Sequence, residues 1–306
     1  MIRAPVDGLE LEYEVRGVGE PVVLIHAGVI ASFFAPLMEQ PALVGAYRVV
    51  RHHRAGYAGS DRVEGPLPFA GQAAHCRALM DHLGIERAHV VGHSSSACMA
   101  LQLAVDAPEA VLSLALLEPA RPAPPTALHR QTVETVLLPA LDQYRAGDPA
   151  AAVDTFMRGV CGAGYRAPLE AAVPGAFEQA VADADTFFGQ ELPAVMEWSL
   201  DRDAAARISA PALVVLGGDS EPVFRERQEL LLDWLPNAEP FELPGATHLL
   251  QVQEPRAMAE RWPRLPLDTP DQGPDGPGGS QAKIGTPGGP QVEPSASRRA
   301  TWAREY

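Results

Sequence analysis

The chain has 306 residues, of which 46% are hydrophobic and 21% charged, and its formal net charge at pH 7 is −15. This is the composition of a globular protein, with length for one large domain or two modest ones. The negative charge would repel nucleic acid phosphates and anionic membrane surfaces, so we expect neither as a partner. No apolar run approaches the roughly 20 residues that span a bilayer, and residues 1–7 lack a signal-peptide core, so we expect a cytoplasmic protein.

Lysine and cysteine usage excludes several kinds of chemistry. Lys283 is the only lysine, and it lies in a segment rich in proline and glycine. The folded part of the chain therefore has no lysine for a Schiff base or a Walker A loop, which excludes enzymes that depend on either. The cysteines, Cys76, Cys98 and Cys161, are far apart, which favours buried reduced thiols over disulfides or a zinc site.

Predicted strands and helices alternate along the first part of the chain. Residues 9–15 alternate apolar and charged side chains, as a half-exposed strand does, and 21–25 form a continuous apolar run. Similar buried runs recur at 47–50, 89–91, 111–117 and 212–216, with helices expected at 72–83 and 96–105. This alternation predicts an α/β fold with a mostly parallel central sheet flanked by helices.

From 119 to 206 the strand patterns stop. Helices are expected at 128–145, 149–160, 169–182 and 192–200. Asp148 is a suitable N-cap for the second of these, with Pro149 at its first position. We expect a helical cap inserted before the penultimate strand. Its large apolar side chains should mostly form the cap's own core, and a minority should line a pocket: Phe156, Met157, Phe187, Phe188, Met196 and Trp198.

The strand pattern resumes after the cap. A helix is expected at 224–234, a short strand at 239–243 and a last helix at 251–261. Residues 263–306 show no periodicity and are rich in Pro, Gly and Ser, which predicts a disordered tail. The expected organisation is a core of residues 1–118 and 207–262, a cap of 119–206 and a tail of 263–306.

A buried strand runs into a helix through Gly92, His93 and Ser94. Small residues permit a tight turn there, and such a turn lifts the serine oxygen above the sheet beside the helix N-terminus. The alternative is that Ser94 only caps the helix. The segment resembles the nucleophile elbow, Gly-x-Ser-x-Gly, of the α/β-hydrolase family, with Ser96 in place of the second glycine. The resemblance implies that Ser94 is the nucleophile and that the Ser95 amide is the first oxyanion donor.

Two further segments resemble loops of the same family. His26-Ala27-Gly28 follows the first buried strand and is similar to the family's His-Gly-x loop, with Ala27 replacing glycine. The resemblance implies that the Gly28 amide is the second oxyanion donor, with Val29 next in line, whereas the His26 side chain is expected to brace the loop. Residues 51–61 resemble the loop after the next strand and receive no catalytic role.

The general base implied by the resemblance is His248, which lies between the last strand and the last helix. Thr247 stands before it where the family usually has glycine. The chain order, with serine first and histidine last, is the order that this fold uses.

The triad acid is open between two strand ends. In the common family pattern it falls at Ser220, which Asp219 and Glu221 flank. The preceding strand ends instead at Glu118, a carboxylate that follows a buried run. A buried carboxylate needs a partner, and a histidine ring would be one, so Glu118 is favoured over Asp219, with Glu221 also possible.

The resemblance implies a serine hydrolase that cleaves a small, largely apolar carboxylic ester through an acyl-enzyme. It implies a small-molecule substrate, no metal and no organic cofactor, and it leaves the oligomeric state open. Position 94 is not the aspartate that haloalkane dehalogenases and epoxide hydrolases of the family need. Two alternatives stay open: a cofactor-free lyase, haloperoxidase or C–C bond enzyme on the same scaffold, and a degenerate member that only binds a ligand.

Overall fold

Within the residues that the computed structural model describes, 1–120 and 125–261, eight strands form one sheet. Their order is β1-β2-β4-β3-β5-β6-β7-β8. β1 pairs antiparallel with β2 and β2 with β4, and all other neighbours are parallel. The strands are β1 (Ile2–Val6), β2 (Leu9–Arg16), β3 (Glu20–Ile25), β4 (Tyr47–His52), β5 (Ala88–His93), β6 (Val111–Leu117), β7 (Ala212–Gly217) and β8 (Ala238–Leu243). The predicted α/β class is confirmed, and β1 is an additional strand.

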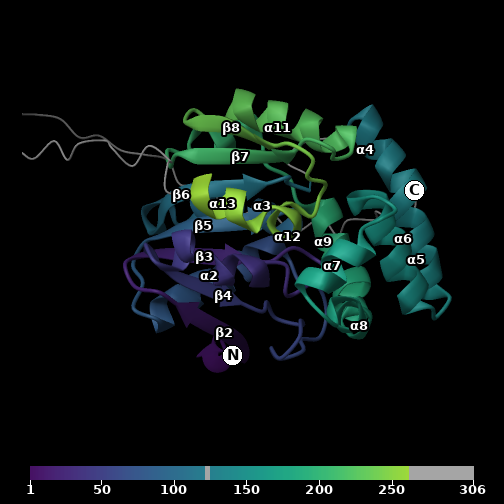
Figure 1. Ribbon diagram of the computed structural model, residues 1–306, viewed down its shortest axis with the longest axis horizontal. Helices are drawn as coiled ribbons and strands as arrows, with labels where there is room; N and C mark the ends of the chain where they lie inside the picture. The colour runs from purple at the N-terminus through teal and green to yellow at the C-terminus, as the bar shows by residue number, and fades with distance from the viewer. Residues whose placement is uncertain (121–124, 262–306) are drawn as a thin grey trace, which may run out of the picture. The chain divides into compact units, whose positions relative to one another are not determined.

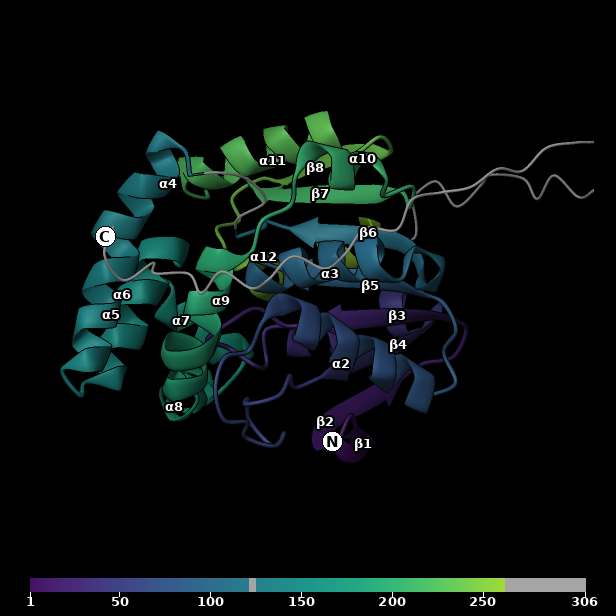
Figure 2. The same cartoon turned by 180° about the vertical axis from the view of Figure 1, so that it is seen from behind.

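Helices cover both faces of the sheet (Figures 1 and 2). Successive side chains of a strand point to opposite faces, so Val23 and Ile25 enter one apolar cluster while Val22 and Leu24 enter another. The first cluster lies beneath α2 (Phe69–His82), α3 (Ser95–Asp106) and α11 (Pro222–Trp234). The second lies beneath η1 (Ala35–Glu39), α1 (Pro41–Val44), α12 (Leu250–Gln253) and α13 (Pro255–Arg261). Two buried faces explain why the central strands are apolar throughout.

Between β6 and β7, residues 127–206 form a series of helices joined by turns, and we call this region the inserted helices. They are α4 (Ala127–Thr132), η3 (Val133–Leu137), α5 (Leu138–Arg145), α6 (Pro149–Cys161), α7 (Arg166–Ala172), α8 (Ala176–Ala182), η4 (Asp185–Glu191), α9 (Leu192–Glu197) and α10 (Arg202–Ala206). The N-cap residue predicted for α6 is confirmed, because Asp148 Oδ1 accepts a hydrogen bond of 2.9 Å from the Ala151 amide. That the inserted helices form a cap separate from the core stays a prediction.

Three of the predicted helices are interrupted. The helix expected at 128–145 contains the π-helical turn η3, and the one expected at 169–182 stops at Ala172 and restarts at Ala176. Pro174 lies in that gap, where proline removes an amide donor and clashes with the preceding turn. The last helix is likewise split, before Pro255. The predicted tail, 263–306, lies outside the described residues.

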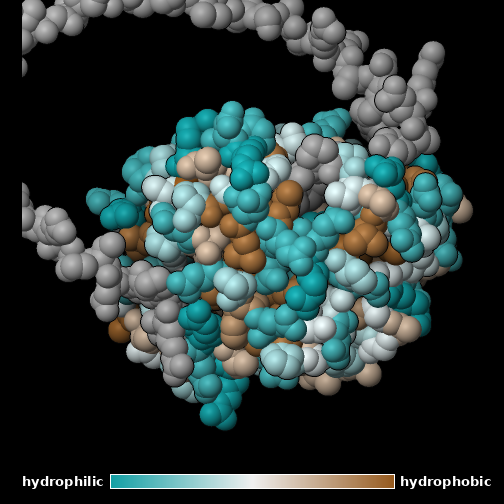
Figure 3. Space-filling model, turned by 90° about the horizontal axis from the view of Figure 1, so that it is seen from above, coloured by the Kyte–Doolittle hydropathy of each residue, from teal (hydrophilic) through white to brown (hydrophobic). Residues whose placement is uncertain are grey.

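The surface and the interior differ as the composition predicts. The face seen in Figure 3 is mostly hydrophilic, with apolar residues gathered in a few small areas. The three cysteines are buried, as predicted, and none of them forms a disulfide bond. No helix in the described part of the chain is long and apolar enough to cross a membrane.

The parallel strands bring six loops to one edge of the sheet. The loops after β3, β4, β5, β6, β7 and β8 all leave the carboxyl ends of their strands, where ligands bind in open α/β sheets. The sequence-predicted site residues follow these strands, so the topology gathers them at this edge.

Candidate active site

The turn between β5 and α3 holds Ser94 in a strained conformation. Its φ and ψ are 55° and −117°, far from those of the helix that follows. A Cβ at Gly92 would lie 2.2 Å from the Ser96 carbonyl oxygen, so only glycine fits before the turn. Positive φ at a non-glycine residue costs energy and persists where surrounding structure enforces it. The sharp elbow that the sequence predicts is therefore present.

Ser96 takes the place of the second family glycine without disturbing the turn. Its side chain is fully buried and accepts a hydrogen bond of 2.8 Å from the His93 amide. It also donates to the Ile25 carbonyl at the end of β3. The hydroxyl thus ties the elbow to the neighbouring strand, which a glycine could not do.

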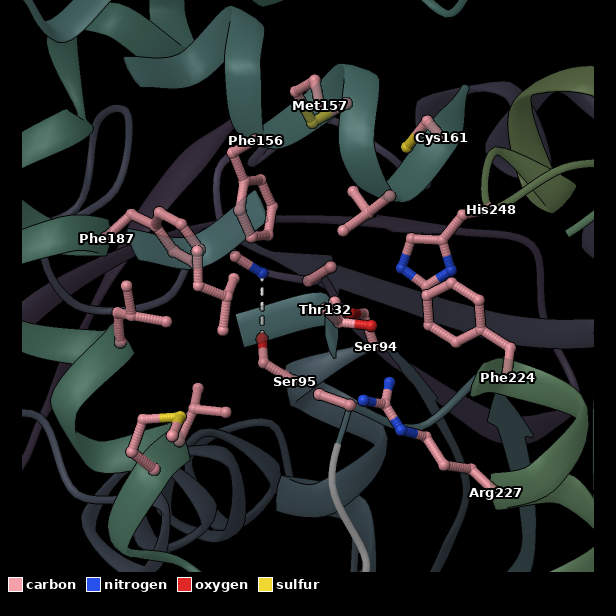
Figure 4. Close-up of a pocket in the computed structure, with 18 of the residues that line it drawn as sticks. Ser94, Ser95, Thr132, Phe156, Met157, Cys161, Phe187, Phe224, Arg227 and His248 are labelled. Carbon is pink, nitrogen blue, oxygen red and sulfur yellow. Dashed lines mark hydrogen bonds between the residues drawn. The ribbon is translucent and has the colours of Figure 1, made fainter. Parts of the chain in front are cut away.

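The loop after β3 lies directly beside the elbow. The Gly28 amide donates a hydrogen bond of 3.0 Å to Ser95 Oγ (dashed in Figure 4). A Cβ at Gly28 would lie 2.5 Å from the Phe187 ring, so this position also requires glycine. Val29 has a φ of 69°. The amide expected to be the second oxyanion donor therefore lies beside the elbow, where the Ser95 hydroxyl engages it.

Ser95 Oγ is held in turn by Glu191, a fully buried residue of η4. Glu191 Oε1 accepts a hydrogen bond of 2.7 Å from Ser95 Oγ. Its Oε2 accepts from Arg54 Nη2 at 2.8 Å and from the Tyr57 hydroxyl at 2.5 Å. This network links the inserted helices to the elbow. No sequence pattern marks Glu191, although Arg54 and Tyr57 lie in the family-like loop 51–61.

His26 braces the same loop, as expected. Its Nδ1 donates to the Ala27 carbonyl at 2.6 Å, and its Nε2 accepts from the Arg54 amide at 3.0 Å. Burial lowers the pKa of His26 well below its usual value, so the ring is neutral.

The structure brings His248 and Glu118 together. His248 Nδ1 lies 2.5 Å from Glu118 Oε2, and Glu118 Oε1 accepts a hydrogen bond of 2.6 Å from the Gly217 amide. Both side chains are buried, whereas Asp219 and Glu221 are exposed. Glu118 also has a positive φ, 44°. Of the three candidate acids, Glu118 is the one that contacts the histidine.

Burial sets the protonation of this pair. It lowers the pKa of His248 to about 3, and the nearby positive charge of Arg227 acts in the same direction. Burial raises the pKa of Glu118 to about 7, against the hydrogen bond from Gly217. His248 is therefore neutral at pH 7, and where Glu118 is ionised the ring donates its Nδ1–H to that carboxylate, which leaves Nε2 as the basic atom. A general base needs this form.

Two rings hold the His248 imidazole in place. Phe224 stacks on it with ring centroids 4.1 Å apart and an angle of 15°, and the His93 ring lies 4.5 Å from it. Thr247, which replaces the family glycine, donates its amide to Gln253 Oε1 at 2.8 Å. The loop that carries His248 is thus anchored on both sides.

Ser94, His248 and Gly28 line one cavity, shown in Figure 4, of about 740 Å³ including its open mouth. Four of the six large apolar side chains noted in the sequence lie on its wall: Phe156, Met157, Phe187 and Met196. Only a minority of these six side chains was expected to line a pocket, but most of them do. The other two pack elsewhere, with Trp198 on Gln102 and Phe188 on Tyr144.

No group of three or more His, Cys, Asp or Glu side chains in the described ranges is placed to hold a metal ion. The chemistry that this arrangement offers is that of a hydroxyl and a neutral imidazole facing an apolar cavity, with a buried carboxylate in contact with the imidazole.

Comparison with known proteins relates this site to a large family. The family model of the alpha/beta hydrolase fold matches residues 20–255. A putative carbamate hydrolase RutD from Klebsiella pneumoniae is 30% identical over 249 residues, covering 77% of this chain and 87% of that protein. The acetyltransferase component of an acetoin cleaving system from Cupriavidus necator is 40% identical over 116 residues, which are 38% of this chain and only 31% of that protein.

The fold has close relatives among solved structures. An esterase from Thermogutta terrifontis superposes with a TM-score of 0.70 at 19% identity, over 86% of this chain and 96% of the esterase. At that identity the likeness concerns the fold alone. With a family match over most of its length, this chain belongs to the α/β-hydrolase fold family, and the match supports hydrolase activity.

Proposed function

We propose that the protein is a serine hydrolase that cleaves a small, largely apolar carboxylic ester, with Ser94 as nucleophile, His248 as general base and Glu118 as the acid. The observation that carries the proposal is the buried Glu118–His248 pair, 2.5 Å apart, beside a cavity whose wall includes the strained Ser94. An apolar cavity suits an apolar acyl or alcohol group.

In the proposed reaction His248 Nε2 takes the Ser94 proton while Ser94 Oγ attacks the ester carbonyl carbon. The tetrahedral intermediate collapses as the carbon–alkoxide bond breaks, and the imidazolium returns its proton to the leaving alcohol. Water then attacks the acyl-enzyme with His248 as base again, the bond to Ser94 Oγ breaks as the imidazolium returns its proton to that oxygen, and the carboxylic acid leaves. Glu118 keeps the ring oriented and stabilises the imidazolium.

The amides of Ser95 and Gly28 would stabilise the oxyanion. Ser95 is the first residue of α3, where amides lack intrahelical partners and the helix dipole favours negative charge. The Gly28 amide must share or exchange its bond to Ser95 Oγ as charge develops on the substrate oxygen. Glu191 can retain the Ser95 hydroxyl during that exchange, because it is the hydroxyl's acceptor.

We also propose that residues 119–206 form a cap over the site. Phe156 and Phe187 from the inserted helices contribute to the cavity wall and contact each other with ring centroids 4.8 Å apart. A lid of this kind excludes water from the acyl-enzyme and selects the substrate by size.

The test is turnover of 4-nitrophenyl acetate and butyrate by the full chain and by Ser94→Ala and His248→Ala. We expect hydrolysis by the wild type and a loss of about 10³-fold or more in kcat for either variant. Ser209→Ala and His82→Ala, both at exposed positions, are matched controls and should keep full activity. A folded wild type that turns over neither ester, or equal rates in Ser94→Ala, would contradict the proposal.

A further inference from the structure

Phe187 of η4 forms the part of the cavity wall that lies against the loop after β3. A Cβ at Gly28 would lie 2.5 Å from Cε2 of this ring, so the ring packs on the backbone of that loop. Phe156 of α6 lines the same cavity and meets the Phe187 ring with centroids 4.8 Å apart and an angle of 62°. The two rings form one aromatic wall beside the elbow.

Phe187 is held in place by the chain that follows it. Phe188 contacts its ring with centroids 4.9 Å apart. Glu191 comes four residues later on η4 and faces the same loop, because a Cβ at Gly28 would also lie 3.0 Å from Glu191 Oε1. That carboxylate is anchored by hydrogen bonds from Ser95, Arg54 and Tyr57. A ring fixed by close packing on an anchored helix sets a definite limit to the space beside the elbow.

The proposed reaction determines which part of the ester faces this wall. The alcohol oxygen must lie near His248, because the imidazolium donates a proton to it as it leaves. The reacting carbon is tetrahedral in the intermediate, so the oxyanion and the acyl chain both lie on the side away from His248. In Figure 4 His248 lies on one side of Ser94, and Phe187 lies on the other, beyond the hydrogen bond between Gly28 and Ser95. The acyl chain therefore extends toward Phe187.

We propose that Phe187, supported by Phe156, determines the length of the acyl chain that the enzyme accepts, so that esters of short-chain acids are preferred to esters of long-chain acids. A ring in a fixed position excludes chain atoms that would overlap it. Each methylene group that a pocket holds or excludes changes the transition-state free energy, and kcat/KM measures that change. This inference rests on the proposed ester hydrolysis and narrows its substrate class.

The test compares 4-nitrophenyl butyrate with 4-nitrophenyl octanoate, which share the alcohol and differ only in the length of the acyl chain. We expect the wild type to prefer the butyrate in kcat/KM. Phe187→Ala should raise the octanoate-to-butyrate ratio of kcat/KM by about 10-fold or more, because the space left by the ring can hold several methylene groups. Phe187→Leu should give an intermediate ratio, and Phe156→Ala should also raise it.

Phe177→Ala is the matched control. Phe177 is a buried phenylalanine of α8, also among the inserted helices, and its ring packs 3.6 Å from the Arg166 guanidinium, outside the wall of this cavity. Its removal costs packing without enlarging the cavity, so the ratio should stay at the wild-type value. Because each ratio is taken within one enzyme, a general loss of kcat in a variant cancels.

Three results would overturn the inference: a wild type that prefers the octanoate, a ratio that Phe187→Ala leaves unchanged, or a ratio that Phe177→Ala raises equally. Calorimetric titration with the neutral acyl analogues butanamide and octanamide separates this inference from the proposed function. If the wild type cleaves neither ester, ester hydrolysis is wrong. A gain in affinity for octanamide relative to butanamide in Phe187→Ala would then still support the size limit, and the absence of that gain would refute it.

Discussion

Lowering the pH from 7.5 to 5.5 should strongly destabilise this protein, because four of its histidines are buried in the neutral form. They are His26, His52, His93 and His248. Burial lowers the pKa of His52 and His248 to about 3, and those of His26 and His93 lie well below the usual value. In the unfolded chain each has a pKa of about 6.5. The stability that these groups contribute is therefore complete above pH 6.5 and is lost as the pH falls toward 3.

The size of the effect follows from proton linkage. Each such histidine costs about 1.4 kcal/mol per pH unit below about pH 6.5, because unfolding then takes up a proton. Glu118 acts in the opposite direction: burial raises its pKa to about 7, so the folded state binds a proton first as the pH falls. That gain offsets about 2 kcal/mol between pH 7.5 and 5.5, which leaves a net loss of about 4 kcal/mol. Typical domains have a total stability of about 5–15 kcal/mol.

Urea unfolding of the full chain at both pH values, followed by tryptophan fluorescence, measures this loss. In His52→Asn the difference between the two pH values should shrink by about 1.4 kcal/mol, since one buried imidazole is gone. His82→Asn, at an exposed position of α2, should leave the difference unchanged. A wild-type loss below about 1 kcal/mol, or a difference that His52→Asn does not reduce, would refute the reasoning.

Three substitutions test other parts of the structure. Glu191→Gln leaves the buried guanidinium of Arg54 without its charge partner. We expect the free energy of unfolding to fall by about 3–5 kcal/mol and the Tm, measured by calorimetry, by about 6–10 °C. Glu178→Gln is the control and should change little, because Glu178 pairs with Arg166 and is 70% exposed. Glu118→Gln should lower kcat for 4-nitrophenyl butyrate by about 10²–10⁴-fold, and Asp219→Asn should keep full activity; the reverse order would identify the other carboxylate as the acid. Gly28→Ala places a Cβ 2.5 Å from an aromatic ring, so chemical unfolding should show a loss of about 1–3 kcal/mol, and an unchanged midpoint would mean that the loop adjusts freely.

The strands and the elbow are predictable from the sequence because they depend on local patterns. Continuous apolar runs mark strands that are buried on both faces, and Gly92 before Ser94 marks a turn that only small residues permit. β1 escapes prediction because it is a short edge strand that contains Arg3 and Pro5, residues that suit an edge rather than a central strand. A proline such as Pro174 indicates that a helix is interrupted, but the number of residues that leave the helix depends on tertiary packing.

The choice of acid and the Glu191 network depend on contacts that a linear sequence does not display. Glu118 and the loop of Asp219 both follow strands at the same edge of the sheet, so the sequence allows either carboxylate to contact His248. The backbone conformation at Glu118, with its positive φ, is not visible in the sequence. Arg54 and Glu191 are separated by 137 residues, and no short-range pattern pairs them. Long-range pairs of this kind are decided by how the inserted helices lie on the core.

The central claim is that Ser94 is an activated nucleophile. The most direct measurement is treatment of the folded protein with a fluorophosphonate, followed by peptide mapping in the mass spectrometer, for the wild type, Ser94→Ala and His248→Ala. We expect one adduct, on Ser94, which His248→Ala greatly slows because the imidazole activates the hydroxyl. An unlabelled wild type, or an adduct at another serine that forms equally in Ser94→Ala, would contradict the account.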